Sequence, residues 1–430
     1  MNREISIGLL GLGTVGSGVA KIIENHRESM QHKLGAKVSI SKVLVKNLDK
    51  QRDTDLDPSV FTTSMEEILD DPSIQIIVEV MGGIEEAHDA IERALKAGKQ
   101  VVTANKDVMA MYGQPLLKLA DEKQCDLFYE ASVAGGIPII RTLEDGLASD
   151  RISALMGIVN GTTNYILTKM DQEGMTYDEA LAKATELGYA EADPSADVDG
   201  LDAARKITIL SSLAYSSAAR LEDVFVRGMK EIRNGDMEIA SRLGYTIKML
   251  GTSKADEEGI EMSVEPVFMK QSHPLAGVHN EYNAVYIHGD AVGETMLYGP
   301  GAGSLPTATS VVSDIIEACR SLLLGVSGKR PHDLQYDYRV KSPELRYSQY
   351  FHRLLVEDEV GVLTKLTAIY SGSGASLRSV IQEPAEQAGK AELILLTHSI
   401  SRKQHLDIME QLEQHAEVLS HYRIEGEDTL

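Results

Sequence analysis

The sequence predicts an α/β protein whose N-terminal part is a doubly wound parallel sheet. Short runs of β-branched residues alternate there with helical stretches, a pattern typical of parallel strands joined by helical crossovers. The runs ISIGLL and IQIIVEV are almost continuously apolar, as expected of strands covered by helices on both faces. A glycine-rich segment follows the first run directly, and this placement is typical of nucleotide-binding folds.

The expected elements of this first domain, residues 1–135, follow one another closely. They are strand 5–10, a helix to about 26, strand 38–45, strand 74–80, helix 85–97, strand 101–103, a helix to about 120 and strand 127–129. Residues 136–299 show a different pattern, and we interpret them as a second, α+β domain. Its expected elements are helices 176–187 and 201–214, an acidic loop at 191–199, and strands 260–267 and 284–288.

The remaining third of the chain predicts a returning helix, a linker and a small third module. A glycine-rich turn at 298–305 precedes an apolar helix at 307–324, and we expect residues 300–326 to pack back on the first domain. The charged, proline-broken stretch 327–348 predicts a linker. At 349–427 the order strand, helix, strand, strand, helix, strand predicts a ferredoxin-like module. Such a module should be removable without opening the preceding core.

Composition excludes several classes of function. The chain has 430 residues and a formal charge of −23, which argues against nucleic-acid binding because such proteins carry a basic surface. No apolar run approaches the roughly 20 residues of a membrane span. Two cysteines allow neither a disulfide framework nor a Cys-based zinc site, and the N-terminus lacks a secretory signal pattern. We therefore expect a cytoplasmic protein that binds neither nucleic acid nor membrane.

The glycine-rich segment GLGTVG, residues 11–16, predicts a dinucleotide site. Gly11 allows a tight turn, Gly13 lets the backbone approach a pyrophosphate, and Gly16 lets helix and strand pack closely. Thr14 and Val15 open the helix whose N-terminus faces the anion. The alternative is a glycine-rich turn with no ligand.

The tip of the second strand favours NADPH over NADH. Lys46 and Arg52 lie at this tip. An acidic residue here would bind the ribose 2′-hydroxyl of NADH, whereas cations suit the 2′-phosphate of NADPH. Asp49 lies close by, so NADH is retained as the alternative cofactor. The alternative is a solvated basic turn.

Two segments carry candidate catalytic groups. Lys106 follows a predicted strand at the sheet edge where such folds bind ligands. Asp202 and Lys206 are one helical turn apart, so that both lie on one face, and Glu191 and Asp197 add nearby carboxylates. Carboxylates can hold a substrate ammonium, and a lysine can protonate the alkoxide left by hydride transfer to an aldehyde. The alternative is an acidic surface loop with a surface ion pair.

These motifs together resemble one family, homoserine dehydrogenase, whose members use NAD(P) to interconvert L-homoserine and L-aspartate 4-semialdehyde in threonine, methionine and isoleucine biosynthesis. Residues 184–206 match the family signature at every specified position. Supporting motifs are GLGTVG, TANK at 103–106, EASVAGGIP at 130–138, NGTTN at 160–164 and GPGAG at 299–303. The length leaves no room for a fused aspartate kinase, so a monofunctional enzyme is expected.

The resemblance also implies roles for individual residues. Lys206 would be the general acid/base, and Lys106 would contact both cofactor and substrate. Gly303 would approach the nicotinamide. The amino end of the substrate would be bound by Glu191 and Asp202, and Asp197 would support these two side chains. Gly161 and Thr162 would also belong to the substrate site. A sodium ion would be held by Glu130 and by the backbone carbonyls of Val133, Gly135 and Ile137.

The C-terminal module resembles an ACT domain, a family of small amino-acid sensors. Residues 358–363 resemble its usual Asp-x-Pro-Gly-Val-Leu turn, with Val360 in place of proline. This resemblance implies L-threonine as an effector, and the alternative is a structural dimerisation module. A homodimer or homotetramer is expected. The rivals for the whole chain are another semialdehyde or hydroxy-acid dehydrogenase and a non-catalytic, amino-acid-sensing regulator that binds nucleotide.

Overall fold

The computed structural model describes residues 3–52, 54–329 and 339–426. They form two compact units. Unit 1 combines Met1–Ile152, Arg205–Glu222 and Asn283–Asp337, and unit 2 combines Ser153–Ala204, Asp223–Tyr282 and Tyr338–Leu430. Among the described residues, none of the helices combines the length and the hydrophobicity that crossing a membrane requires.

Unit 1 contains a parallel six-stranded sheet in the order β3-β2-β1-β4-β5-β6, the order of dinucleotide-binding doubly wound sheets. The strands are β1 (Arg3–Leu10), β2 (Ala36–Leu44), β3 (Phe61–Thr62), β4 (Ile76–Glu79), β5 (Gln100–Thr103) and β6 (Leu127–Phe128). Every pair in this sheet is parallel. The structure therefore confirms the doubly wound sheet, and it adds the short strand β3, which the sequence pattern did not indicate.

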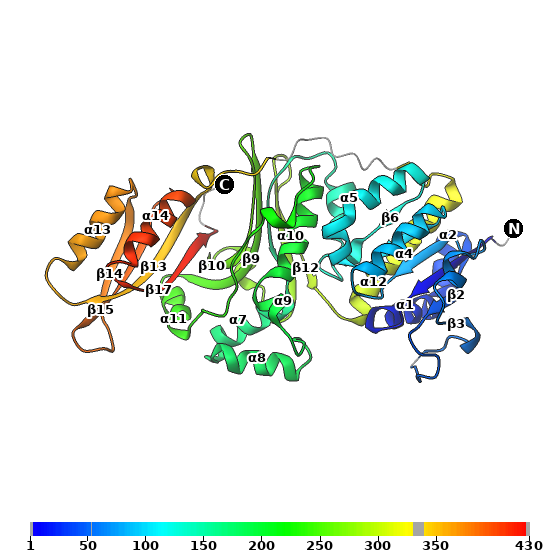
Figure 1. The fold of residues 1–430 in the computed structure, drawn as a ribbon, viewed down its shortest axis with the longest axis horizontal. Helices are drawn as coiled ribbons and strands as arrows, with labels where there is room; N and C mark the ends of the chain where they lie inside the picture. The colour runs from blue at the N-terminus through cyan, green and yellow to red at the C-terminus, as the bar shows by residue number, and fades with distance from the viewer. Residues whose placement is uncertain (1–2, 53, 330–338, 427–430) are drawn as a thin grey trace. The chain divides into compact units, whose positions relative to one another are not determined.

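Helices cover this sheet, as Figure 1 shows. They are α1 (Thr14–Asn25), α2 (Arg27–Leu34), α3 (Glu66–Leu69), α4 (Glu85–Lys96), α5 (Lys106–Lys123) and α12 (Ser304–Leu324). Helix α12 shares a hydrophobic core with β1, β2 and α1. It lies so close to α1 that a Cβ on Gly18 would be 2.7 Å from the carbonyl oxygen of Ser304.

Unit 1 also contains α6 (Ile139–Arg141), a π-helical turn at Thr142–Gly146, and strands β11 (Tyr282–Gly289) and β12 (Gly293–Pro300). Residues 298–300, which we expected in a turn, instead end strand β12, a neighbour of β11. That expectation was wrong because the strand alternates exposed and half-buried residues up to Pro300, although its glycine and proline are residues typical of turns. The turn itself is confined to residues 301–303.

Unit 2 is built on a mixed sheet with the strand order β7-β9-β10-β17-β13-β15-β14. The strands are β7 (Ile152–Ile158), β9 (Tyr245–Asp256), β10 (Gly259–Lys270), β13 (Tyr347–Glu357), β14 (Leu377–Pro384), β15 (Lys390–Thr397) and β17 (Glu417–Glu425). Two short strands, β8 (Phe225–Val226) and β16 (Ile400–Ser401), pair with β10 and β13. The helices are α7 (Gly161–Glu173), α8 (Tyr177–Glu186), α9 (Ser195–Val198), α11 (Asn234–Arg242), α13 (Val362–Gly372) and α14 (Arg402–Leu412). Helix α10 (Leu201–Ala214) continues from unit 2 into unit 1.

The C-terminal segment shares this sheet with the strands before it. Strand β17 pairs in parallel with β10, with Val267 opposite Arg423, and antiparallel with β13. The compact units thus divide the chain differently from the sequence-based domains, whose boundaries stay predictions. Of the expected linker, residues 330–338 lie outside the described residues, and β13 already begins at Tyr347. Residue 427, the expected end of the module, also lies outside them.

Candidate active site

The three motif glycines are required for different physical reasons. Gly11 has a φ of +102°, and a Cβ there would be 2.9 Å from the carbonyl oxygen of Val80. A Cβ on Gly16 would be 2.3 Å from the carbonyl oxygen of Gly11. Nothing lies within 4 Å of a Cβ on Gly13. Gly13 therefore faces open space at the N-terminus of α1, where backbone amides favour an anion.

A second glycine turn is joined to the first. Gly303 has a φ of +119° and precedes α12. The Ser304 hydroxyl donates a hydrogen bond to the carbonyl oxygen of Thr14 at 2.6 Å. This bond fixes the start of α12 beside the start of α1, so that two helix N-termini meet in unit 1.

The two cations at the tip of β2 have different surroundings. Lys46 is exposed. The Arg52 guanidinium donates to the carbonyl oxygens of Lys50, at 2.6 Å, and of Asn47, and its Cζ lies 5.3 Å from the Phe61 ring centre. Arg52 therefore orders its own loop, whereas Lys46 is exposed; the assignment of both cations to the cofactor stays a prediction.

The carboxyl ends of β4 and β5 are held together by a buried network that centres on Glu79. The Thr103 hydroxyl donates to Glu79 Oε2 at 2.6 Å, and the amide of Met81 donates to Oε1 at 2.8 Å. Burial raises the pKa of the Glu79 carboxyl. Asn105 caps α5, because its Oδ1 accepts from the Val108 amide at 3.1 Å. Lys106 is thereby fixed as the first residue of α5.

An ion pair joins the two helices that carry the candidate lysines. Arg205 Nε lies 2.9 Å from Asp107 Oδ1, and both side chains are half-buried. Asp107 follows Lys106 in the first turn of α5, and Arg205 precedes Lys206 on α10. Within unit 1 the structure thus brings the two lysine-bearing segments into contact.

The candidate carboxylates of unit 2 meet at one amide. The Asn160 Nδ2 donates to Asp197 Oδ1 at 2.7 Å and to Asp202 Oδ2 at 2.8 Å. Asn160 is itself fixed as the N-cap of α7. Asp202 is 4% exposed, whereas Glu191 is exposed. The shared amide holds the two carboxyl groups close together, and neighbouring carboxylates suit a cationic ligand.

The other two predicted substrate residues border this group. The Thr162 hydroxyl donates to the carbonyl oxygen of Tyr189 at 2.6 Å, which ties α7 to the loop after α8. A Cβ on Gly161 would be 2.7 Å from the carbonyl oxygen of Glu281. A side chain at position 161 would therefore clash with the backbone of Glu281, and the Thr162 hydrogen bond fixes the loop after α8.

Comparison with known proteins decides the family. A family model described as "Homoserine dehydrogenase, NAD binding domain" matches residues 11–130, and one described as "Homoserine dehydrogenase" matches residues 138–316. A homoserine dehydrogenase of Bacillus subtilis (strain 168) is 51% identical over 428 residues, 99% of each chain. The chain belongs to the homoserine dehydrogenase family. It is accordingly an oxidoreductase of amino-acid biosynthesis.

Solved homoserine dehydrogenases share the fold. The structure of one from Thiobacillus denitrificans aligns with a TM-score of 0.92 at 36% identity and covers 98% of each chain. A hyperthermophilic archaeal homoserine dehydrogenase in complex with NADPH aligns with a TM-score of 0.63 at 29% identity. That alignment covers 77% of this chain and 100% of the archaeal one.

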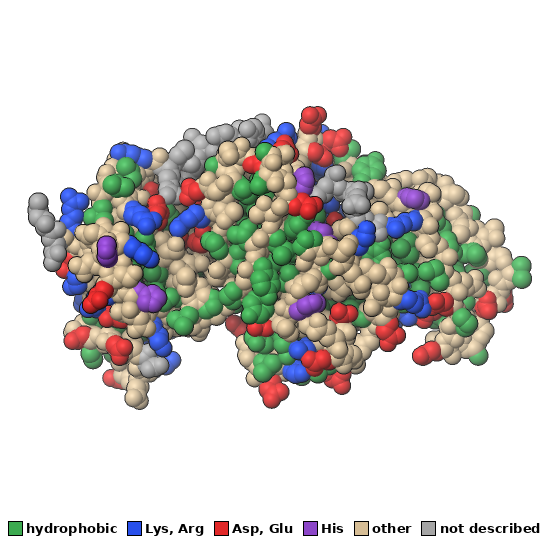
Figure 2. Space-filling view, turned by 180° about the vertical axis from the view of Figure 1, so that it is seen from behind, with side chains coloured by type: hydrophobic (Ala, Val, Ile, Leu, Met, Phe, Trp, Pro, Cys, Tyr) green, Lys and Arg blue, Asp and Glu red, His purple; other side chains and the backbone are tan. Residues whose placement is uncertain are grey.

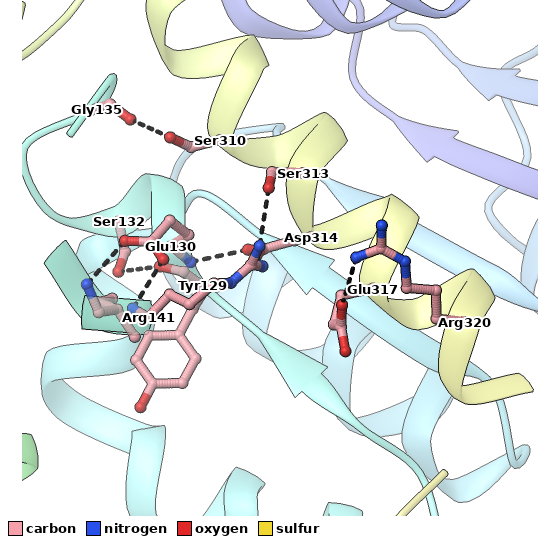
Figure 3. A network of polar contacts seen from close by, with 11 residues as sticks. Tyr129, Glu130, Ser132, Gly135, Arg141, Ser310, Ser313, Asp314, Glu317 and Arg320 are labelled. Atoms are coloured by element: carbon pink, nitrogen blue, oxygen red, sulfur yellow. Dashed lines mark hydrogen bonds and ion pairs between the residues drawn. The ribbon is translucent and has the colours of Figure 1, made fainter. Parts of the chain in front are cut away.

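The segment expected to bind a cation in this homoserine dehydrogenase chain is anchored to α12 (Figure 3). Glu130 accepts from the amides of Ile140 and Arg141 at 2.8 and 2.9 Å. Its own amide donates to Asp314 Oδ2 at 2.9 Å, and Arg141 Nη2 donates to Asp314 Oδ1 at 2.9 Å. Burial raises the pKa of Glu130 and that of Asp314, the latter to about 8. Arg141 thus binds both buried carboxylates, Glu130 through its backbone amide and Asp314 through its guanidinium.

The backbone of this segment is strained at its tip. Ala134 and Gly135 have φ values of +52° and +36°, and such strain concentrates at functional sites. The Ser310 hydroxyl donates to the carbonyl oxygen of Gly135 at 2.6 Å. In the described part of the chain no three His, Cys, Asp or Glu side chains are grouped to hold a metal. A cation here would therefore depend on backbone carbonyls, which with one carboxylate suit a hard monovalent ion.

Three buried polar residues, Asn160, Glu79 and Asp314, are not predicted by the sequence pattern. Asn160 lies in the NGTTN motif, so its signal was present, but an asparagine before a helix is usually only a cap. Glu79 ends an apolar strand, where a buried carboxylate is itself unusual. Asp314 lies within an apolar helical run, and nothing in the sequence names its partners, Glu130 and Arg141.

Proposed function

We propose that the chain uses NADPH to reduce L-aspartate 4-semialdehyde to L-homoserine, and runs the reverse reaction, with Lys206 as the general acid/base. The observation that carries this assignment is the Arg205–Asp107 ion pair, which brings the Lys206 helix to the helix that begins at Lys106. Bound NADPH supplies the hydride to the aldehyde carbon. The Lys206 ammonium gives its proton to the carbonyl oxygen as that oxygen becomes negative.

Lys106 has a different task in this proposal. It begins α5 at the carboxyl end of β5, the sheet edge where doubly wound folds bind ligands. Its positive charge stabilises the developing alkoxide and lies next to the cofactor. In the reverse direction Lys206 accepts the homoserine hydroxyl proton, which requires a neutral amine.

The ammonium group of the substrate is assigned to Asp202 and Glu191, with Asp197 in support. The shared Asn160 amide holds Asp197 and Asp202 side by side. A positive ligand relieves the repulsion between two carboxylates so placed. Glu191 is exposed and can approach the ligand from the outer side of the loop.

Asp202→Asn is expected to raise the KM for homoserine by roughly 30-fold or more, since losing a desolvated charge partner costs about 2 kcal/mol at least. The asparagine keeps an oxygen that can accept from Asn160, so the loop should stay in place. Glu191→Gln should act in the same direction. Steady-state kinetics with each substrate varied in turn measures this effect. Asp193→Asn, in the same loop but outside the site, is the matched control, and an equal rise in the KM for NADPH would contradict the assignment.

NADPH is preferred over NADH in this proposal because Lys46 is exposed at the tip of β2. The archaeal homoserine dehydrogenase bound to NADPH supports this preference. Lys46→Glu is expected to lower the NADPH to NADH ratio of kcat/KM, because a glutamate repels a 2′-phosphate and accepts a hydrogen bond from a 2′-hydroxyl. Kinetics with both cofactors measures the ratio. Lys50→Glu is the control, and an unchanged ratio for Lys46→Glu would show that Lys46 points away from the ribose.

A monovalent cation, normally sodium in this family, is assigned to Glu130 and the carbonyls of Val133, Gly135 and Ile137. When bound, the ion supplies a fixed positive charge that orders the loop. The buried carboxylate and the strained turn at Ala134 and Gly135 support the assignment.

The C-terminal segment is proposed to be an ACT module that responds to L-threonine. Its order β13-α13-β14-β15-α14-β17 supports this, while Val360 stands fully exposed where proline is usual. One assay tests activity and effector together: purified protein with aspartate semialdehyde, NADPH or NADH, and threonine present or absent. No turnover with either cofactor would overturn the proposed function.

Assembly into a homodimer or homotetramer is proposed from exposed apolar side chains. Three apolar side chains just before and along β12 are 39–52% exposed, namely Val292, Met296 and Tyr298. Exposed apolar surface marks interaction sites. Figure 2 shows hydrophobic side chains gathered near the middle of one face, with Lys and Arg scattered among Asp and Glu. Both cysteines are free and buried, which fits the proposed reducing cytoplasm.

A further inference from the structure

The carboxylate loop, defined here as residues 188–202, includes α9 and the start of α10 and carries Asp197 and Asp202. It is docked on the residues at and after strand β8. The Met229 amide donates to the carbonyl oxygen of Val198 at 3.0 Å. A Cβ on Gly228 would be 3.0 Å from that same oxygen, so a side chain there would require the loop backbone to shift. On the other side of the loop, a Cβ on Gly200 would be 3.1 Å from Val226 Cγ1. The carboxylate loop therefore takes its position from residues 226–229.

Arg227, in the middle of this support, is held by the C-terminal segment. Its backbone amide donates to the carbonyl oxygen of Val264 on β10 at 2.9 Å. Its Nη1 donates to the carbonyl oxygen of His421 on β17 at 2.9 Å and lies 3.1 Å from both ring nitrogens of that residue. Its Nη2 donates to the carbonyl oxygen of Pro266 at 3.2 Å. One guanidinium thus joins β8, β10 and β17.

The partner of Arg227 belongs to a buried array of rings inside the C-terminal segment. His421 lies 5.3 Å from His405, ring centre to ring centre. His405 Nδ1 is 3.1 Å from His352 Nε2, and His352 Nδ1 is 3.0 Å from the Tyr370 hydroxyl. Burial lowers the pKa of His352 and of His421 to about 3, and that of His405 as well. Near neutral pH Arg227 therefore meets an uncharged ring that accepts its hydrogen bond.

Two features show that this contact is more than general core packing. Arg227 reaches the C-terminal strand through its side chain and the carboxylate loop through the next two residues of its backbone. Lys230, one residue further, adds an ion pair of 2.8 Å to Asp199 on the same loop. A shift in the position of β17 would consequently move Arg227, and through Gly228 and Met229 it would move the carboxylate loop.

We propose that Arg227 is a positioning residue, through which strand β17 of the C-terminal segment sets the placement of the substrate carboxylates Asp197 and Asp202. The inference deepens the proposed function and rests on it, because those carboxylates are assigned there to the substrate ammonium. Arg227 itself touches neither substrate nor cofactor in this proposal. It acts through Gly228, Met229 and the loop that these residues hold.

The test compares Arg227→Lys with Arg423→Lys in the full-length protein. Lysine keeps the positive charge but has no planar fork, so it cannot hold β10 and β17 at once. Arg227→Lys is expected to raise the KM for homoserine between about 10-fold and about 100-fold, since small misplacements are that costly. The dissociation constant for NADPH should stay within about twofold of the wild-type value, because unit 1 carries the glycine turns. Amide hydrogen exchange of residues 188–202 should become faster with no substrate present.

Arg423→Lys is the matched control. Arg423 lies two residues after His421 on β17 and is buried, whereas Arg227 is half-buried. The Arg423 side chain contacts Thr252 at 3.0 Å, Glu265 at 3.3 Å and Glu425 at 3.4 Å, and none of these residues belongs to β8. It should lower the thermal unfolding temperature without changing the KM for homoserine or the exchange of residues 188–202. Equal effects from the two variants, or unchanged KM and exchange in Arg227→Lys, would overturn the inference. If the wild-type protein did not turn over homoserine, the proposed function would fail, while the exchange measurement would still decide whether Arg227 positions the loop.

Discussion

Lys206→Ala is expected to lower kcat by about 10²–10⁴-fold, the usual contribution of general acid–base catalysis. Affinity for NADPH should be nearly unchanged, because the cofactor contacts that we propose involve residues other than Lys206. Lys206 is half-buried on α10, so the substitution removes little packing. Steady-state kinetics in both directions and a direct NADPH titration measure the two quantities.

Lys206→Arg separates proton transfer from charge. Arginine keeps the positive charge but does not release its proton near neutral pH, so this variant should remain slow in the direction of homoserine oxidation. Lys118→Ala, an exposed lysine on α5, is the control for removing a cation from unit 1. Turnover close to wild type in Lys206→Ala would leave Lys106 as the candidate acid/base.

Local patterns made the nucleotide-binding unit predictable from sequence. The apolar strands, the GLGTVG turn and the helix at 201–214 depend on residues close together in the chain, and the structure has α10 at Leu201–Ala214. The order of the first sheet follows from short right-handed crossovers. The lysines and the acidic loop were found because polar residues at these positions serve no packing purpose.

Long-range pairing made the rest unpredictable. Strand β7 pairs with β9 across almost a hundred residues, with Ala154 opposite Lys254, and β17 returns to β10 from the end of the chain. No local sequence pattern indicates which strand β7 or β17 pairs with. For the same reason Asn160, Glu79 and Asp314 were missed, because a buried polar side chain is recognised by its partners, and those are distant in sequence.

The largest revision that the structure brings concerns removal of the C-terminal segment. The linker pattern suggested that ending the chain at Ser348 would leave a folded, active enzyme, whereas the shared sheet predicts loss of folded protein. Deletion would remove β17 from the edge of β10 and expose Phe268, which is fully buried and lies 4.3 Å and 4.7 Å from the rings of Phe351 and Tyr422. An uncovered strand edge with apolar side chains promotes aggregation.

Deletion would also remove three side-chain donors from a buried carboxylate. Asp236 on α11 is fully buried and accepts hydrogen bonds from Arg353 at 3.0 Å, Ser420 at 2.7 Å and Tyr422 at 2.9 Å. All three donors lie in the deleted segment. Breaking a buried ion pair by removing one partner costs about 3–5 kcal/mol, a large share of the roughly 5–15 kcal/mol that stabilises a whole domain. Together with the exposed aromatic core, this loss is enough to unfold unit 2.

Soluble yield, circular dichroism and thermal unfolding of the chain ending at Ser348 measure this effect, and we expect little soluble protein and no cooperative transition. Tyr422→Phe in the full-length chain is the milder companion variant, because it removes one donor to Asp236 and keeps the ring packing. It should fold and unfold at a lower temperature than wild type. A truncated chain with wild-type turnover and a cooperative unfolding transition would contradict this prediction. It would show that residues 1–348 fold without β17, as the linker pattern suggested, and that β10 tolerates an unpaired edge.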